Sequence, residues 1–125
     1  MRGGPIITTG DTMNANFTYN AKVTRVVDGD TVVAVVDLGF SIKATMIFRL
    51  KGINTPELIS ATRDAAIRAK DYLAERVEGK DITIKTYKDR KEKYGRYLAE
   101  LFVDDVNINQ QLIIEAYAVA DDGKR

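Results

Sequence analysis

The sequence predicts a mainly β domain, built as a five-stranded Greek-key barrel of the OB-fold type with a helix after strand 3 and a short C-terminal helix. Three observations support this fold class. Apolar and polar residues alternate along several short segments, and apolar residues recur every four positions in residues 61–77. The resulting order of three strands, helix, two strands, helix excludes a doubly wound parallel sheet. A partly open sheet with two helices would give the same pattern.

The first three strands are predicted in the N-terminal half of the chain. Residues 17–27 alternate, so that Phe17, Tyr19, Ala21 and Val23 would share one face of a strand. The next run follows an Asp-Gly turn, and a second turn at Gly39 separates it from the third. Pro56 and Gly52 then mark a loop. The second strand, the third strand and this loop are predicted at residues 31–38, 41–50 and 51–58.

A helix is predicted from about Ala61 to Val77. Ser60 or Thr62 can cap its start, and Gly79 lies just past its end. The fourth and fifth strands are predicted at residues 81–87 and 96–103.

The last predicted element is a short helix over residues 108–118. Asn107 can cap it, and Ile108, Leu112 and Ala116 would form its apolar face.

The chain of 125 residues is long enough to bury one core, and residues 13–125 are predicted to form a single OB-fold domain. Residues 1–12 are rich in Gly and Thr without periodicity, and we expect them to be disordered or tag-like. Neither a signal peptide nor a stretch of 18 apolar residues is present, so a cytoplasmic protein without membrane contact is expected.

Two residue types are absent, and both absences restrict the chemistry. Without cysteine there is no disulfide, thiolate zinc site or cysteine nucleophile. Without histidine there is no Ser-His-Asp triad and no histidine general base. Catalysis by this chain would therefore rely on carboxylates, Arg, Lys, Tyr and a hard metal ion with oxygen ligands.

The sequence Asp28–Gly29–Asp30 separates two runs of β-branched residues and has two interpretations. It is typical of a tight hairpin turn, because Gly29 can adopt a positive φ and Asp28 can accept a hydrogen bond within the turn. Two carboxylates can also bind a cation. A calcium loop of the helix-loop-helix kind is excluded, because Val32, Val33 and Gly39 occupy positions where that loop needs ligands.

The net charge is only +1, but basic residues concentrate in one segment. Residues 85–96 contain six basic and two acidic residues, with Tyr87 and Tyr94 between them. Such a segment suits phosphate and base contacts, and a solvated hairpin loop would look the same.

Four short stretches together suggest phosphodiester chemistry. "VVDGDT" is followed by "FRLKGINTPE", "KYGRYLAEL" and "VNINQQLI", which supply acids near a strand end and arginines on two strands. A hard metal can polarise a phosphate, a carboxylate can deprotonate water, and two guanidiniums can stabilise the transition state. Each stretch alone also has an ordinary structural explanation as a turn, helix start or surface strand.

With these four motifs in this order, the chain resembles the staphylococcal nuclease (thermonuclease) homologues over about residues 19–120. The resemblance implies an OB-fold enzyme that cleaves single-stranded or frayed DNA and RNA with one Ca²⁺ ion and leaves 3′-phosphates. It is expected to act as a monomer without an obligate protein partner, in a compact form such as occurs in bacteriophages and bacteria.

The resemblance also implies roles for individual residues. Asp30, Asn54 and the Thr55 carbonyl would bind the metal. Asp28 would not bind it directly but would help to fix the turn that carries Asp30. Glu57, Arg49 and Arg96 would be catalytic. Lys93 and Tyr94 would contact a terminal phosphate of bound nucleotide.

One position departs from the family pattern. Asn54 stands where the prototype has a second calcium-binding aspartate, so this ligand is neutral. The alternative function is therefore a non-catalytic OB-fold module that binds single-stranded nucleic acid or protein.

Overall fold

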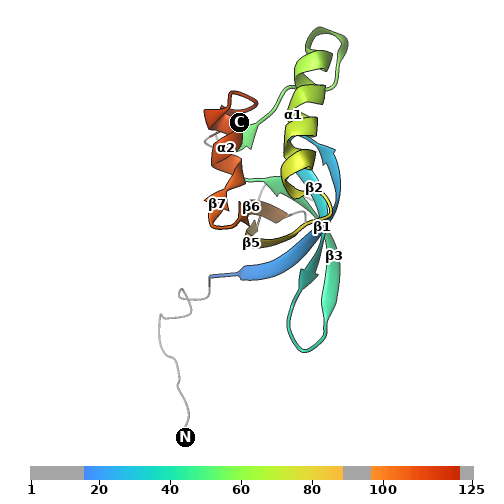
Figure 1. Cartoon of the computed structure of the whole chain (residues 1–125), viewed down its shortest axis with the longest axis vertical. Helices are drawn as coiled ribbons and strands as arrows, with labels where there is room; N and C mark the ends of the chain where they lie inside the picture. Colours follow the sequence, from blue (N-terminus) through green and yellow to red (C-terminus); the bar gives the residue numbers. More distant parts are fainter. Residues whose placement is uncertain (1–15, 89–96, 122–125) are drawn as a thin grey trace, which may run out of the picture.

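The computed structural model describes residues 16–88 and 97–121 of the chain. The main elements follow the predicted order, three strands, a helix, two strands and a helix (Figure 1). Their bounds are β1 (Thr18–Asp28), β2 (Thr31–Asp37), β3 (Lys43–Leu50), α1 (Arg63–Val77), β5 (Asp81–Lys88), β6 (Tyr97–Val103) and α2 (Ile108–Ile114). Three two-residue strands, β4 (Ile53–Asn54), β7 (Val106–Asn107) and β8 (Val119–Ala120), were not predicted from the sequence.

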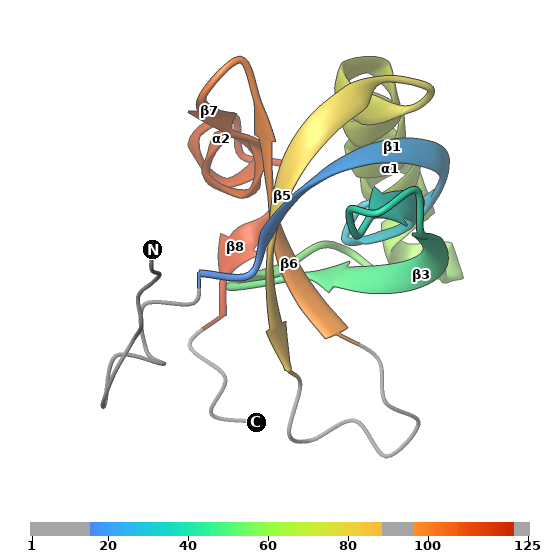
Figure 2. The same ribbon diagram turned by 90° about the horizontal axis from the view of Figure 1, so that it is seen from below.

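The five long strands form a closed barrel, which confirms the predicted fold class. They are hydrogen-bonded in the order β3-β2-β1-β5-β6, and β3 pairs with β6 to close the circle (Figure 2). Every pairing of neighbouring strands is antiparallel except the closing one, in which Phe48, Arg49 and Leu50 run parallel to residues 97–99 of β6. The strand ends near residues 50 and 97 are thereby held side by side.

The core fills the barrel and extends under both helices. Val23, Val32, Ile84 and Leu101 are fully buried inside the barrel. Alternation along the strands explains this, because neighbouring residues point to opposite faces of the sheet. The prediction fails for Phe17, which precedes β1 with a φ of 49° and is 55% exposed.

Helix α1 packs its predicted apolar stripe against the barrel. Ala69, Leu73 and Val77 are completely buried, and Gly79 follows the helix with a φ of 77°. The predicted start is slightly early, because residues 60–62 form a 3₁₀ turn. Thr62 stands at the cap position, but its hydroxyl donates to the Glu57 carbonyl instead of capping the helix.

Helix α2 begins as predicted and ends earlier than predicted. The Asn107 side chain accepts a hydrogen bond from the Gln110 amide at 3.1 Å, which caps the helix. The helix stops at Ile114, and Ala116 is exposed with a φ of 65°. The prediction that Ala116 lies on the apolar face was therefore wrong. The chain turns there, so that Ala118 enters the core and β8 pairs with β4.

None of the helices in the described ranges is both long enough and apolar enough to cross a membrane.

Candidate metal and phosphate site

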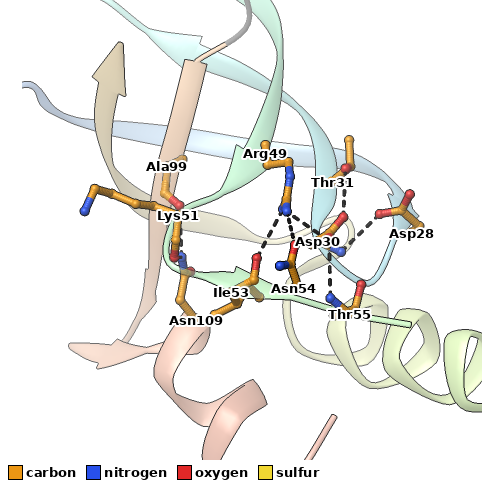
Figure 3. Close-up of polar contacts among 10 residues, drawn as sticks. All are labelled: Asp28, Asp30, Thr31, Arg49, Lys51, Ile53, Asn54, Thr55, Ala99 and Asn109. Carbon is orange, nitrogen blue, oxygen red and sulfur yellow. Dashed lines mark hydrogen bonds and ion pairs between the residues drawn. The ribbon is translucent and has the colours of Figure 1, made fainter. Parts of the chain in front are cut away.

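The turn between β1 and β2 holds Asp30 at one end of the barrel. Asp28 pairs with Thr31, and the Asp28 side chain accepts a hydrogen bond from the Asp30 amide at 3.1 Å, as predicted for a turn. The Asp30 carbonyl accepts from the Leu50 amide at 2.8 Å, which ties the turn to the end of β3. The backbone of Asp30 is thus fixed on both sides, and its carboxylate points towards β3 and β4 (Figure 3).

Gly29 is required in this turn by space and not by backbone conformation. The expected positive φ is not found, since positive φ values occur at Gly39, Gly52 and Gly79 among the described glycines. A Cβ atom on Gly29 would instead lie 2.9 Å from the Ala69 Cβ of α1 and 2.9 Å from the Thr55 Oγ1. Only glycine therefore lets the turn approach both the helix and the loop that carries Asn54 and Thr55.

Arg49 joins the turn to this loop. Its Nη1 lies 3.1 Å from the Asp30 Oδ2 and donates to the Ile53 carbonyl at 3.3 Å, while its Nη2 donates to the Asn54 Oδ1 (Figure 3). The Arg49 and Asp30 side chains are only 15% and 16% exposed. The Arg49 guanidinium is therefore largely shielded from solvent. These contacts involve at most three of the five N–H donors of the guanidinium.

The environment of Asp30 disfavours its negative charge relative to that of an exposed carboxylate. Burial, followed by the contact with Asp28, raises the pKa of Asp30, while Arg49 and the Thr55 amide lower it. The Thr55 N–H lies 3.4 Å from Asp30 Oδ2, and the Thr31 hydroxyl donates to Oδ1 at 3.2 Å. The raised pKa shows that burial and the second carboxylate outweigh the attraction of Arg49.

The donor atoms at this site fit a hard cation. Asp30 offers a carboxylate and Asn54 an amide oxygen, and both belong to the class that Ca²⁺ and Mg²⁺ prefer. In the parts of the chain that the structure describes, no three carboxylates gather at one point, so a metal would depend on neutral oxygens as well. Asp30 and the Asn54 Oδ1 already contact the Arg49 guanidinium, so a bound cation would share these oxygen ligands with it.

Glu57 lies near this cluster in the sequence, but among the described residues it forms no hydrogen bond or ion pair with the cluster. Its backbone carbonyl is anchored by the Ile59 amide at 2.9 Å and the Thr62 hydroxyl at 2.5 Å, just before α1. The side chain is exposed, and within residues 16–88 and 97–121 it has no hydrogen bond or ion pair. The backbone of Glu57 is therefore held by hydrogen bonds, while its side-chain carboxylate is exposed.

The sequence-predicted site is brought together in part. Asp28, Asp30, Arg49, Asn54 and Thr55 form one cluster. A metal-binding role for the Thr55 carbonyl stays a prediction, because the observed contact is made by the Thr55 amide. The predicted residues Lys93, Tyr94 and Arg96 lie outside the described residues.

Asn109 supports the site and was not predicted. It is 1% exposed, and its Nδ2 donates to the carbonyls of Lys51 and Ala99 at 2.9 and 3.0 Å, while its Oδ1 accepts from the Leu101 amide at 3.1 Å (Figure 3). It thereby holds the start of the loop that carries Ile53 and Asn54. The sequence signal for this role was an asparagine beside the predicted apolar face of the helix. A polar residue that becomes buried there is expected to be hydrogen-bonded.

Comparison with known proteins gives related sequences. Residues 47–124 match the family described as staphylococcal nuclease homologue. The chain is 31% identical over 125 aligned residues to an uncharacterized protein of Methanocaldococcus jannaschii, covering 80% of the chain and 58% of that protein. It is 30% identical to endonuclease YhcR of Bacillus subtilis, covering 84% of the chain and 9% of the endonuclease. It is 28% identical to the thermonuclease of Staphylococcus hyicus, covering 94% of the chain and 67% of the thermonuclease.

Proposed function

Because the chain belongs to the staphylococcal nuclease homologue family, we propose that it is a nuclease that hydrolyses phosphodiester bonds in DNA and RNA. The observation that carries this proposal is the cluster of Asp30, Arg49 and Asn54 at one end of the barrel. It combines oxygen donors suited to a hard cation with a rigidly held guanidinium that has donors to spare. The names of the related endonuclease and thermonuclease support the same activity.

In this proposal the substrate is single-stranded or frayed, and neither the sugar nor the base selects it. The remaining N–H donors of Arg49 bind the scissile phosphate and stabilise the charge that develops on it. Anchoring by Asp30, Asn54 and the Ile53 carbonyl keeps the guanidinium in place, so little reorganisation is needed when the phosphate arrives. Arg96 would be the second phosphate-binding arginine.

Glu57 is proposed as the general base. Its carboxylate takes a proton from the attacking water while the water oxygen bonds to phosphorus. The bond between phosphorus and the 5′ oxygen then breaks, the leaving oxygen takes a proton from solvent water to become a 5′-hydroxyl, and Glu57 returns its proton to solvent. The phosphate stays on the 3′ side.

Asp30, the Asn54 amide oxygen and the Thr55 carbonyl would hold a hard divalent cation, calcium first. Such an ion would polarise the phosphate and lower the pKa of bound water. Asp28 fixes the Asp30 backbone and contributes negative charge behind it.

Cleavage of single-stranded DNA should require a hard divalent cation and stop when the cation is removed. Purified protein is incubated with labelled single-stranded DNA and single-stranded RNA, with calcium and with excess chelator, and the fragments and their end groups are analysed. Undiminished cleavage in chelator would contradict the proposed mechanism. Retarded but intact nucleic acid at every metal concentration would instead identify a non-catalytic OB-fold module, which the neutral Asn54 keeps as the alternative.

Asn54→Asp should tighten calcium binding to the free protein and lower the calcium concentration needed for half-maximal cleavage. A carboxylate adds charge where the amide offers a neutral oxygen, and charged ligands raise calcium affinity. In the parent, phosphate oxygens of the bound strand would supply the missing charge, so metal and substrate should bind with positive coupling.

The two constants are measured by calorimetry and by activity at one ionic strength. Asn20→Asp is the matched control, because it adds the same charge at an exposed position of β1. If Asn54→Asp changes neither constant more than the control does, the side chain of residue 54 does not bind the metal.

A further inference from the structure

Lys51, Lys85 and Tyr87 form a basic cluster on the outer face of the barrel, beside the Arg49 site. The Lys51 Nζ lies 4.7 Å from the centre of the Tyr87 ring, and the Lys85 Nζ lies 5.6 Å from it. A tyrosine ring attracts ammonium groups through its quadrupole, so both ammonium groups are drawn to the same ring. We call these three residues the lysine–tyrosine cluster.

The Tyr87 ring is a fixed platform. Its hydroxyl donates to the Glu100 Oε1 at 2.6 Å, and the Glu100 Oε2 accepts from the Asn107 amide group at 3.5 Å. Burial and the bond to Glu100 raise the pKa of Tyr87 to about 12, so the ring stays neutral at physiological pH.

The backbone of Lys51 is held in place as well. Its amide donates to the Ala99 carbonyl at 2.8 Å, and its carbonyl accepts from Asn109 at 2.9 Å. Both hydrogen-bonding groups of its backbone are therefore held, while its side chain is directed away from Arg49 and Asp30 (Figure 3). In the described ranges neither Lys51 nor Lys85 has a carboxylate within ion-pair distance. Among the residues that the structure describes, the cluster thus presents two ammonium groups without an ion-pair partner, although Glu100 lies opposite Lys85 in the pairing of β5 with β6.

The register of the barrel places this cluster in line with Arg49. Arg49 pairs with Leu98 of β6, and Leu98 pairs with Tyr87 of β5. Phe48 and Leu50 point into the core, so Arg49, Leu98 and Tyr87 form one row on the outer face of three adjacent strands. Two strand spacings separate Arg49 from Tyr87, which is about 10 Å.

We propose that the lysine–tyrosine cluster is a second phosphate-binding site, which holds the backbone of the substrate strand a few nucleotides away from the phosphate at Arg49. The inference rests on the proposed nuclease function. Lys51 and Lys85 bind a phosphate, and Tyr87 keeps the two ammonium groups together while no ligand is bound. A strand that rises ~3.4 Å per nucleotide when stacked covers the separation within a few nucleotides. The substrate would therefore cross β3, β6 and β5 in that order or its reverse.

The test uses the double variant Lys51→Gln/Lys85→Gln of the full chain. Lys22→Gln/Lys43→Gln is the matched control, because Lys22 and Lys43 are exposed and line a different cleft together with Asp37, Asp81, Asp104 and Asp105. Lys43 begins β3 and lies six residues from Arg49, roughly 20 Å along the strand. Both variants change the net charge by the same amount.

Binding of a long single-stranded oligonucleotide is measured in chelator over a range of salt concentrations. Each lost phosphate contact lowers the slope of log affinity against log salt by about 0.7. The Lys51/Lys85 variant should bind more weakly and lose about 0.7 from its slope, and Glu100→Gln, which removes the nearby negative charge, should bind more tightly than the parent. Equal slopes for the Lys51/Lys85 variant and its control would overturn the proposal.

Cleavage kinetics separate this site from the catalytic function. The Lys51/Lys85 variant should raise KM for the long oligonucleotide and leave kcat unchanged, and it should cleave a dinucleotide as the parent does, since a dinucleotide cannot reach the cluster. A parent that binds but never cleaves would refute the nuclease function. The salt dependence of binding would then still decide whether the lysine–tyrosine cluster binds phosphate. A parent that cleaves, with a Lys51/Lys85 variant indistinguishable from the control, would refute the site alone.

Discussion

Replacing Glu57 by glutamine is expected to lower kcat about 100- to 10,000-fold while leaving the affinity for single-stranded DNA nearly unchanged. Glutamine has the same size but cannot accept a proton from water. Folding should be unaffected, because the exposed Glu57 side chain has no hydrogen bond or ion pair within the described ranges, where only its carbonyl accepts hydrogen bonds, from Ile59 and Thr62.

The measurement pairs single-turnover cleavage with binding in chelator. Glu115→Gln, an exposed glutamate at the end of α2, is the matched control and should cleave like the parent. If Glu57→Gln loses binding in proportion to rate, then Glu57 holds the loop or the strand and is not the base.

Replacing Arg49 by lysine should reduce kcat by about 100-fold or more. Lysine keeps the charge and can still pair with Asp30, but a point charge cannot also reach Asn54 and the Ile53 carbonyl and still bind two phosphate oxygens. The same substitution at Arg96 is expected to have an effect of similar size.

Because Arg49 is largely buried, its replacement should also lower the free energy of unfolding somewhat, and thermal unfolding is recorded beside activity. Arg68→Lys on the exposed face of α1 is the matched control. An Arg49→Lys protein that folds and cleaves nearly as fast as the parent would make Arg49 a structural ion-pair partner of Asp30 only.

Local patterns predicted the barrel because they report which face of each element is buried. Alternation along β1 and β2 and the four-residue repeat of α1 depend only on neighbours in the chain, and the buried residues Val23, Val32 and Leu73 follow them. The end of α2 could not be predicted in this way. Nothing in "EAYA" interrupts helical periodicity, and the turn at Ala116 results from the return of the chain to pair β8 with β4.

The candidate site was predicted as a set of residues, but its contacts were not. Motif order brought Asp30, Arg49 and Asn54 together correctly, because all three lie at strand ends or adjoining loops. That Arg49 would bind Asn54 and Asp30 directly depends on side-chain positions across two loops, which sequence spacing does not determine. Gly29 shows the same limit, because its close approach to Ala69 and Thr55 is a tertiary contact that resembles an ordinary turn signal in the sequence.

The parallel pairing of β3 with β6 has a consequence for how the molecule assembles. Phe48 and Tyr97 are separated in the chain by α1 and β5, so their contact is non-local. Closing a large loop costs conformational entropy before the new contact can stabilise the chain, so the barrel should close late in folding. Arg49 belongs to the closing pair, and Lys51 is bonded to Ala99 directly beside it. A refolding chain would therefore regain its local hairpins and helices before the barrel closes, and its phosphate site would form with that closure.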